Sequence, residues 1–276
     1  MPIVFACAAS HAPGITACTE AAPKEQSEKI VGGYEKLRQM LQAARPEALV
    51  AITVEHWANF FLNQMPAFCL GRADHYDGPI EEWLRIPKTR VPGDSQFASQ
   101  LLDSCYHAGF DLTFSDELLF DHATMLPLHF LIPRMDIAVI PLIVNALTPP
   151  MPTPRRCYEL GKVLGEAFER TEKKVAIVAT GGLSHWPGEP KAGKINTEFD
   201  REFLEALTDG NHGRLAGYTH AELAEAGSGA HEVRTWIALA AAVRNWKAQL
   251  LAYEPVVPWA TGCGLVIFHS RGSMSG

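Results

Sequence analysis

Apolar residues recur along this chain at two spacings, one typical of strands and one typical of helices. Short runs of β-branched and other apolar residues predict six strands, at residues 3–9, 48–54, 137–144, 174–180, 249–253 and 264–268. Between the first two runs, helical spacing from Ile30 to Leu41 predicts a helix at residues 25–44, and Arg45-Pro46 marks its end. Gly, Pro or Asp residues bound the other amphipathic segments, which predict helices at 95–108, 156–168, 197–207 and 231–245.

Strands that alternate with amphipathic helices are typical of a sheet covered by helices on both faces. The sequence therefore predicts an α/β protein, with a single three-layer α/β/α domain around a central mixed sheet. The Pro-rich stretches at residues 148–154 and 186–190 predict surface loops rather than domain boundaries, because strand-like runs resume soon after each. We expect residues 1–276 to form one domain.

Composition and charge narrow the class of ligand. The 276 residues are 47% hydrophobic, which is enough for one sizeable core. The net charge is −7 and no run of Lys or Arg occurs, which argues against nucleic acid or an anionic membrane surface as the main partner. A small molecule is the favoured ligand.

Cysteine usage and hydropathy bear on location. The six cysteines are dispersed without a CxxC pair, and the chain does not open with a basic segment followed by an apolar leader. No apolar window approaches the roughly 18 residues that a transmembrane helix needs. We therefore expect a reduced, cytoplasmic protein without a membrane span.

Five histidine-containing motifs carry the candidate chemistry. They are Ser10-His11-Ala12-Pro13, Glu55-His56-Trp57, Asp121-His122-Ala123, Gly181-Gly182-Leu183-Ser184-His185 and His231-Glu232. Two imidazoles and one carboxylate with open coordination positions are typical of non-haem iron(II) oxygenases. His11, His56 and His185 each follow a predicted strand, so we expect them to meet at the edge formed by the carboxyl ends of the strands.

Glu232 and His231 compete for the inward face of the predicted last helix, because adjacent helical residues point about 100° apart. Glu232 shares its face with Trp236 and Leu239, whereas His231 shares a more polar side with Arg234. A carboxylate on an apolar face needs a partner, because an unpaired buried charge is costly. A metal ion would serve, which favours Glu232 as the carboxylate ligand.

Each of these residues also has a purely structural explanation. His11 could be a buried or capping histidine, and His56 could pack in the core beside Phe60 and Phe61. Glu232 could be an ordinary first-turn carboxylate, which the helix dipole favours. His122 and His185 could be ordinary loop residues. The prediction of one active site therefore depends on the joint pattern of these residues and not on any one of them.

The motifs together resemble the class III extradiol ring-cleavage dioxygenases almost from end to end. The likeness extends to the run Met65–Gly71, to Pro127-Leu128 after His122, and to Trp236 after Glu232. The resemblance implies that His11, His56 and Glu232 bind Fe(II). It also implies that His185 and His122 are the catalytic histidines, with His185 as the candidate base.

The implied reaction opens an aromatic ring that carries two adjacent hydroxyl groups, with insertion of both atoms of dioxygen. The partners would be a small aromatic diol and O2. Phe60, Phe61 and Trp186 are weak candidates for the ring pocket, and core packing explains them equally well. Some relatives pair the catalytic chain with a small helical subunit, so both a homo-oligomer and a helper subunit are consistent with the sequence.

Two departures from the family pattern leave the substrate open. Glu55 precedes the second histidine where relatives often carry Asp, which could change the hydrogen bonds that orient the ligand imidazole. The stretch 195–200 is closer to the protocatechuate and gallate branch than to the dihydroxyphenylpropionate enzymes. Catechols, gallate-like triols and hydroxypyridones all remain candidates.

Two other functions use the same residues. A metal-dependent hydrolase could hold zinc with these ligands. A non-catalytic, Memo-like metal-binding protein of the same fold is the third alternative. The presence of both His122 and His185 argues against that third alternative, since a pure binding role requires neither.

Overall fold

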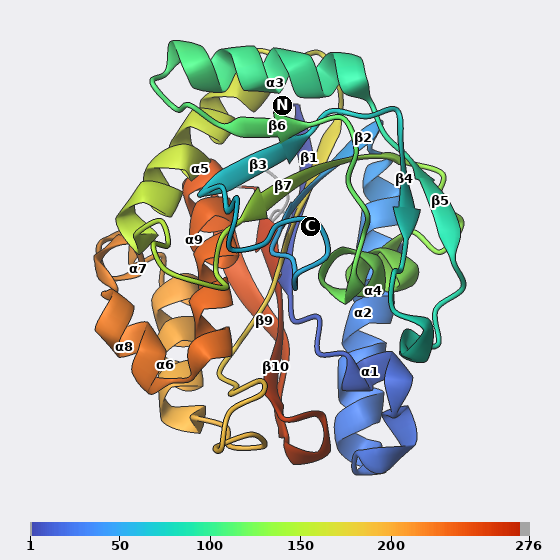
Figure 1. Ribbon diagram of the computed structural model, residues 1–276, viewed down its shortest axis with the longest axis vertical. Helices are drawn as coiled ribbons and strands as arrows, with labels where there is room; N and C mark the ends of the chain where they lie inside the picture. The colour runs from blue at the N-terminus through green and yellow to red at the C-terminus, as the bar shows by residue number, and fades with distance from the viewer. Residues whose placement is uncertain (1, 271–276) are drawn as a thin grey trace.

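An eight-stranded mixed sheet forms the centre of the molecule. The computed structural model describes residues 2–270 (Figure 1). The strand order is β6-β3-β7-β2-β8-β1-β10-β9, and β4 and β5 form a separate two-stranded ribbon. The strands are β1 (Ile3–Ala9), β2 (Ala48–Thr53), β3 (Phe68–Gly71), β4 (His75–Gly78), β5 (Thr89–Pro92), β6 (Thr113–Ser115), β7 (Ala138–Val144), β8 (Val175–Thr180), β9 (Lys247–Val256) and β10 (Thr261–His269).

Helices cover both faces of this sheet. Figure 1 shows α5, α6, α7, α8 and α9 on one side and α1, α2 and α4 on the other. The helices are α1 (Gly14–Ala17), α2 (Lys24–Ala44), α3 (Ser95–His107), α4 (His122–Leu131), α5 (Pro154–Glu169), α6 (Thr197–Thr208), α7 (His212–Gly217), α8 (His220–Glu225) and α9 (Val233–Ala242). Short 3-10 helices are η1 (Thr19–Ala21), η2 (Glu82–Leu84), η3 (Ser228–Glu232) and η4 (Val257–Trp259). The predicted three-layer α/β/α fold is confirmed.

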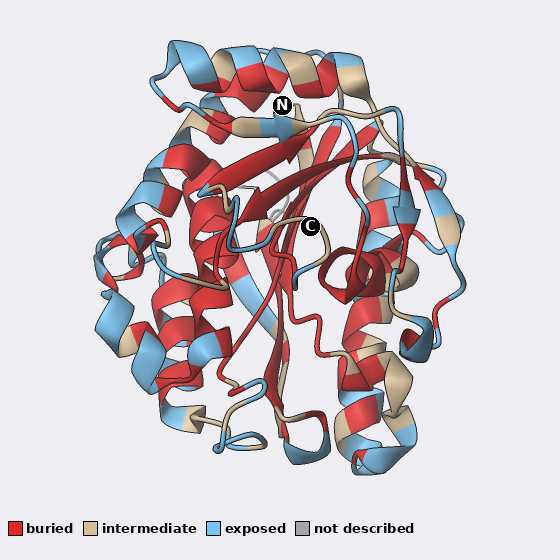
Figure 2. Ribbon diagram, in the orientation of Figure 1, coloured by how far each residue is buried: buried red, intermediate tan, exposed pale blue. Residues whose placement is uncertain are grey.

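The sheet separates two apolar cores, and alternate residues of each strand face one or the other. In β2, Val50 and Ile52 pack in the core beneath α5 and α9, while Leu49 and Ala51 pack in the core beneath α2 and α4. β2 and β8 are buried along their whole length (Figure 2). Parallel strands buried on both faces have continuous apolar sequences, which explains why the sequence predicts them well.

The structure differs from the predicted elements in three respects. The helices α1, α4, α7 and α8 were not predicted. Four short strands, β3 to β6, were not predicted, because runs of three or four residues give no clear periodicity. The predicted helix at 231–245 is replaced by η3 and α9, so Glu232 lies in a 3-10 turn rather than inside an α-helix. Gly227, which has a φ of +108°, turns the chain into η3 immediately before it.

The described part of the chain, residues 2–270, contains no helix long and apolar enough to cross a lipid bilayer. The buried helices α4 and α9 are only 10 residues each, and both pack against the sheet. Their apolar character therefore serves the cores of this fold.

Candidate active site

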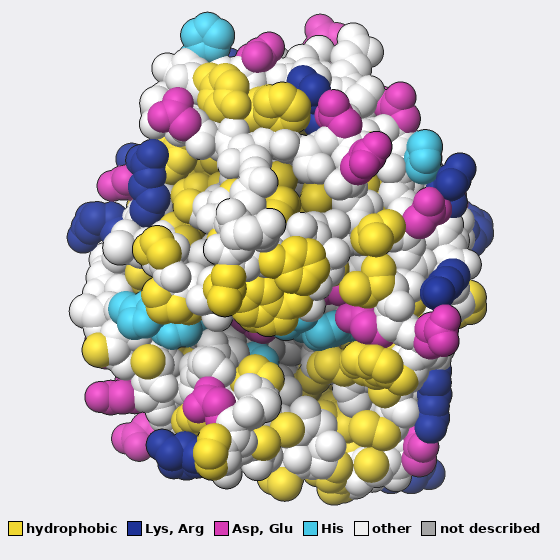
Figure 3. Space-filling model, in the orientation of Figure 1, with side chains coloured by type: hydrophobic (Ala, Val, Ile, Leu, Met, Phe, Trp, Pro, Cys, Tyr) yellow, Lys and Arg dark blue, Asp and Glu magenta, His cyan; other side chains and the backbone are white. Residues whose placement is uncertain are grey.

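The predicted site residues gather where four parallel strands end. β7, β2, β8 and β1 are adjacent and parallel, and His11, His56 and His185 follow β1, β2 and β8. His122 begins α4, which packs on β2 and β8, and Glu232 ends η3 just before α9, which also packs on β8. Figure 3 shows histidine side chains along a hollow in the middle of one face. The structure thus brings five predicted residues together at one edge of the sheet.

Glu232 lies at the centre of this cluster. Its Oε1 is 3.2 Å from His56 Nε2 and 3.7 Å from His185 Nε2, and its Oε2 is 3.3 Å from His11 Nε2. The backbone N–H of Gly182 donates to Oε2 at 2.6 Å. Burial opposes ionisation of this carboxyl, but the neighbouring imidazoles outweigh burial and hold its pKa well below the usual range.

His11 is held from behind by a chain of threonine hydroxyls. Its Nδ1 is 3.3 Å from Thr180 Oγ1, which is 2.8 Å from Thr53 Oγ1, and Thr124 Oγ1 donates to Thr53 at 3.3 Å. The other ring nitrogen, Nε2, is buried and has no hydrogen-bond partner although Glu232 is close. Thr180 therefore orients the ring so that Nε2, which has no hydrogen-bond partner, faces the cluster.

His56 is oriented by Asp121, a residue to which the sequence analysis assigns no role. Asp121 Oδ2 accepts hydrogen bonds from the backbone N–H and from Nδ1 of His56. Burial disfavours the imidazolium, but hydrogen bonds to Asp121 and Glu232 outweigh burial and raise the pKa of His56 to about 10. Glu55, which could change the hydrogen bonds around this ring, has backbone partners of its own: its Oε2 accepts from the N–H groups of Ala58 and Asn59.

His122 has a carboxylate partner of its own, Glu81, which the sequence analysis missed. Its Nδ1 is 2.6 Å from Glu81 Oε1, and its ring stacks on His56 with a centroid distance of 4.2 Å. Burial and the neighbouring His56 lower the pKa of His122, so the neutral ring is favoured. His11, His56 and His122 also present ring nitrogens within 4.8 Å of one another. Either Glu232 or His122 could therefore complete a metal site with His11 and His56.

His185 lies in a tightly fixed loop. Its Nδ1 is 3.0 Å from the carbonyl oxygen of Leu183, and a carbonyl only accepts, so Nδ1 carries a proton and Nε2 is the free nitrogen of the neutral ring. The adjacent Ser184 donates its N–H and its hydroxyl to the buried Asp200 at 2.8 and 2.9 Å. Tyr253 also donates to Asp200 at 2.8 Å. Burial raises the pKa of Asp200 to about 6.

The three aromatic candidates for the ring pocket lie in different environments. Phe60 packs against the core on the α2 side, and Phe61 is half exposed and stacks on Trp57 with a centroid distance of 6.4 Å. Trp186 is buried against Gly227, and the Lys194 ammonium lies 5.4 Å from its ring centroid. The prediction that Phe60, Phe61 and Trp186 line the ring pocket stays a prediction.

His231, the neighbour of Glu232, has separate partners. Its Nδ1 is 2.9 Å from Arg234 Nη1, and its ring stacks on His220 with a centroid distance of 4.4 Å. Burial, together with the Arg234 cation, lowers the pKa of His231 to about 3. Arg234 also donates to the carbonyl oxygens of Pro152 and His231. His231 therefore belongs to a buried structural network beside the cluster.

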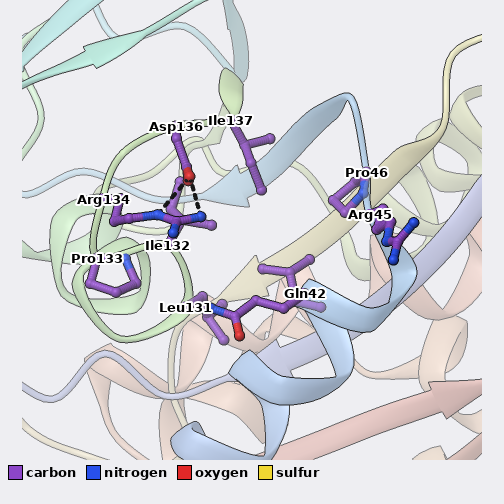
Figure 4. A pocket seen from close by; sticks show the side chains of 10 residues that line it. Gln42, Arg45, Pro46, Leu131, Ile132, Pro133, Arg134, Asp136 and Ile137 are labelled. Atoms are coloured by element: carbon purple, nitrogen blue, oxygen red, sulfur yellow. Dashed lines mark hydrogen bonds and ion pairs between the residues drawn. The ribbon is translucent and has the colours of Figure 1, made fainter.

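A pocket of about 500 Å³ lies at the opposite edge of the sheet (Figure 4). Its lining includes Arg45 and Pro46 just before β2, and Asp136 and Ile137 just before β7. Arg134 Nε donates to Asp136 at 2.8 Å across part of this pocket. Ligands of parallel sheets bind beyond the carboxyl ends of the strands, and this pocket lies at the amino ends. It is therefore separate from the histidine cluster.

Comparison with known proteins identifies the family. Residues 5–264 match the family described as the catalytic LigB subunit of aromatic ring-opening dioxygenase. The chain belongs to this family. The predicted membership of the class III extradiol dioxygenases, and with it the prediction of a ring-cleaving enzyme, is confirmed.

Named relatives of this dioxygenase agree with the family. Proteins named 2,3-dihydroxyphenylpropionate/2,3-dihydroxicinnamic acid 1,2-dioxygenase are similar to it. The one from Photorhabdus laumondii is 28% identical over 294 residues, covering 88% of this chain and 91% of the relative. The one from Klebsiella pneumoniae is 27% identical over 290 residues, covering 86% and 90%.

A solved structure has the same fold as this dioxygenase. It is the crystal structure of the uncharacterized protein JW3007 from Escherichia coli K12, with a TM-score of 0.65 and 16% sequence identity. The alignment covers 96% of this chain and 99% of that one. At this identity the likeness concerns the fold alone, including the three-layer arrangement that positions the cluster.

Proposed function

We propose that this enzyme is a non-haem Fe(II)-dependent extradiol dioxygenase that opens the ring of a catechol-like aromatic with O2. The proposed iron ligands are His11, His56 and Glu232. The observation that carries this assignment is the buried Nε2 of His11, which has no hydrogen-bond partner and lies 3.3 Å from the Glu232 carboxylate. Two imidazole nitrogens and one ionised oxygen suit Fe(II), although they also suit manganese.

Bound iron would act as a Lewis acid toward the two hydroxyl groups of the substrate and would supply electrons to dioxygen. The protein's own part is to hold ligands and to move protons. Asp121 accepts a hydrogen bond from Nδ1–H of His56, and Thr180 faces Nδ1 of His11, so each ring directs Nε2 toward Glu232. This arrangement leaves the metal-binding nitrogens preoriented.

His185 is the proposed base. Because the Leu183 carbonyl accepts a hydrogen bond from Nδ1–H, the neutral ring can take a proton from a substrate hydroxyl at Nε2 and return it later in the reaction. His122 is held in the same way by Glu81, so its Nε2 is a second site for a proton at the edge of the cluster. The negative charge of Glu81 would stabilise the imidazolium that forms there.

The test is anaerobic reconstitution with Fe(II), followed by oxygen uptake and product absorbance with catechols, gallates, hydroxypyridones and 2,3-dihydroxyphenylpropionate. We expect one O2 consumed for each ring opened. Substituting Glu232→Gln should lower the bound iron, whereas His185→Gln and His122→Gln should retain iron and lose turnover. His107→Gln, at the exposed end of α3, is the matched control. Full activity of Glu232→Gln would remove Glu232 from the ligand set.

A zinc hydrolase is the second candidate, because His11, His56 and His122 form an alternative three-histidine set. Three histidines with an open fourth position are typical of catalytic zinc. Under this alternative, His122→Gln rather than Glu232→Gln would abolish metal binding. Activity with zinc in the absence of oxygen would also favour the hydrolase over the dioxygenase.

The assembly is also a proposal. We propose that residues 1–276 act as a single catalytic domain and that the enzyme works as a homo-oligomer. Light scattering on the purified, active enzyme measures the subunit number. A chain that is inactive alone, and that gains activity with a small second subunit, would contradict self-sufficiency.

A further inference from the structure

Exposed apolar side chains gather beside the catalytic histidines. Of the eleven exposed large hydrophobic residues in the described part of the chain, six lie in three segments that adjoin His56 and His122. Their exposed fractions run from 37% to 80%. The six are Trp57, Phe61, Leu62, Ile80, Trp83 and Leu119. We call them the apolar rim.

Contacts between the three segments make the rim one surface. Asn59 Nδ2 donates to the carbonyl oxygen of Leu119 at 2.9 Å, and the Leu119 N–H donates back to Asn59 at 2.8 Å. The ring of Trp83 lies 6.1 Å from the ring of His122. Figure 3 shows hydrophobic side chains gathered beside the hollow that the histidines line. Exposed apolar patches of this kind mark binding sites.

The segments that carry the rim contain acidic side chains, and their one imidazole with a raised pKa, His56, is already paired with Asp121 and Glu232. Residues 55–67, 79–84 and 116–122 include no Lys or Arg. The closest cations in sequence are already paired: Arg72 with Asp116 at 2.8 Å, and Arg85 with Glu20 at 3.1 Å. A lysine or arginine would best replace the lost hydration of a carboxylated substrate, and these segments contain neither.

Glu81 adds a negative charge at the point where the rim meets His122. Its Oε1 accepts from Nδ1 of His122 at 2.6 Å and from its backbone N–H at 3.1 Å. Its Oε2 is buried and has no hydrogen-bond partner. An anionic substituent beside this oxygen would be repelled, whereas an apolar or hydrogen-bond-donating substituent would not.

We propose that this site selects diols whose other substituents are uncharged and apolar over diols that carry a carboxylate, and that Glu81 is a specificity-determining residue. This inference rests on the proposed dioxygenase function. It assigns the apolar rim to the substituent of the substrate, while the two hydroxyl groups lie at the proposed metal ligands. Glu81 also positions His122. Removing the charge of Glu81 should therefore change both the preference between substrates and the orientation of His122, and the two effects can be measured separately.

The experiment compares each acid with its methyl ester, because the pair differs chiefly in charge. The iron-loaded enzyme is assayed with 2,3-dihydroxyphenylpropionate, protocatechuate and gallate, and with the three esters. We expect kcat/KM to favour the esters at least tenfold, and anaerobic dissociation constants to favour them similarly.

Substituting Glu81 separates its effect on substrate preference from its effect on the position of His122. Glu81→Gln should lower kcat for every diol and bring the ester-to-acid ratio of dissociation constants several-fold closer to one. Glu82→Gln is the matched control, since Glu82 is the exposed neighbour in η2, and its ratio should stay as in the wild type. If Glu81→Gln does not fold, Trp83→Ala tests the rim by weakening binding of the esters only.

Two results would overturn the inference. One is a wild-type preference for the acids, in which case Lys191→Ala and Lys194→Ala would identify the cation responsible. The other is a Glu81→Gln enzyme with lower kcat but an unchanged ratio, which would make Glu81 a positioning residue only. Failure to turn over any diol, with the esters still bound more tightly, would contradict the dioxygenase function instead of the selectivity.

Discussion

Asp121 Oδ2 accepts two hydrogen bonds from His56, one from its backbone N–H at 2.7 Å and one from its ring Nδ1 at 3.0 Å. Asp121 also caps α4, because its Oδ1 accepts from the N–H of Ala123 at 3.0 Å. One carboxylate therefore fixes both the direction of a proposed ligand and the start of the helix that begins with His122. Asp121 therefore links His56, which follows β2, to His122, which begins α4.

The first prediction concerns Asp121→Asn. The substitution removes the charge that holds the His56 ring, and we expect iron affinity to fall roughly 10- to 100-fold, the usual effect of losing such a partner. Competition with a chelator under anaerobic conditions measures the change. Asp116→Asn, at the exposed pair with Arg72, is the control. Unchanged affinity in Asp121→Asn would mean that the ring needs no such support.

The second prediction concerns Gly229, which lies against His185. A Cβ atom at this position would lie 2.1 Å from Cε1 and 2.2 Å from Nε2 of the His185 ring. Gly229→Ala should therefore displace the ring and lower kcat by tenfold or more, because small misplacements of a catalytic group are costly. Iron content should stay near the wild-type value.

The control for this prediction is Gly217→Ala, since an added Cβ there meets nothing within 4 Å. Steady-state kinetics and metal analysis of the two variants are compared. A fully active Gly229→Ala enzyme would show that the loop moves freely and that the close approach has no functional role.

The third prediction is a pH dependence of stability due to Asp200. Burial raises its pKa from 3.8 to about 6, so the folded state holds this proton more tightly than the unfolded state does. The contribution of Asp200 to the free energy of unfolding is greatest below pH 4, and this contribution is lost as the pH rises through about 6. Two pH units correspond to on the order of 3 kcal/mol. Above that range the contribution stays constant.

Urea unfolding of the metal-free wild type and of Asp200→Asn between pH 4 and 7 measures this effect. The difference in unfolding free energy should change across this range and then level off. Asp209→Asn, at an exposed position, should follow the wild type at every pH. Parallel curves for Asp200→Asn and the wild type would place the pKa of Asp200 near its ordinary value.

The fourth prediction concerns metal removal. A metal that binds only the folded state, at about a hundred times its dissociation constant, stabilises the fold by about 3 kcal/mol. A chelator should therefore lower the melting temperature by roughly 5 to 10 °C for a chain of this size. Glu232→Gln should show little response to the same treatment. An equal response in both proteins would place the metal elsewhere.

The sequence by itself determined the architecture and most of the cluster. Buried parallel strands such as β2 and β8 have continuous apolar runs, and the residues that follow such strands must meet at one edge of the sheet. His11, His56 and His185 follow β1, β2 and β8, so their convergence could be predicted from local patterns alone. The apolar face of the predicted last helix favoured Glu232, and the family motifs supplied the role of His122.

Only the tertiary structure decided which groups orient and tune these residues. Asp121 is 65 residues from His56, Glu81 is 41 residues from His122, and Asp200 is 16 residues from Ser184. A hydrogen bond between such distant residues leaves no periodic signal in the sequence, because its geometry depends on how loops from different strands pack. The direction of a side chain in a loop, such as that of Trp186 against Gly227, depends on the same packing.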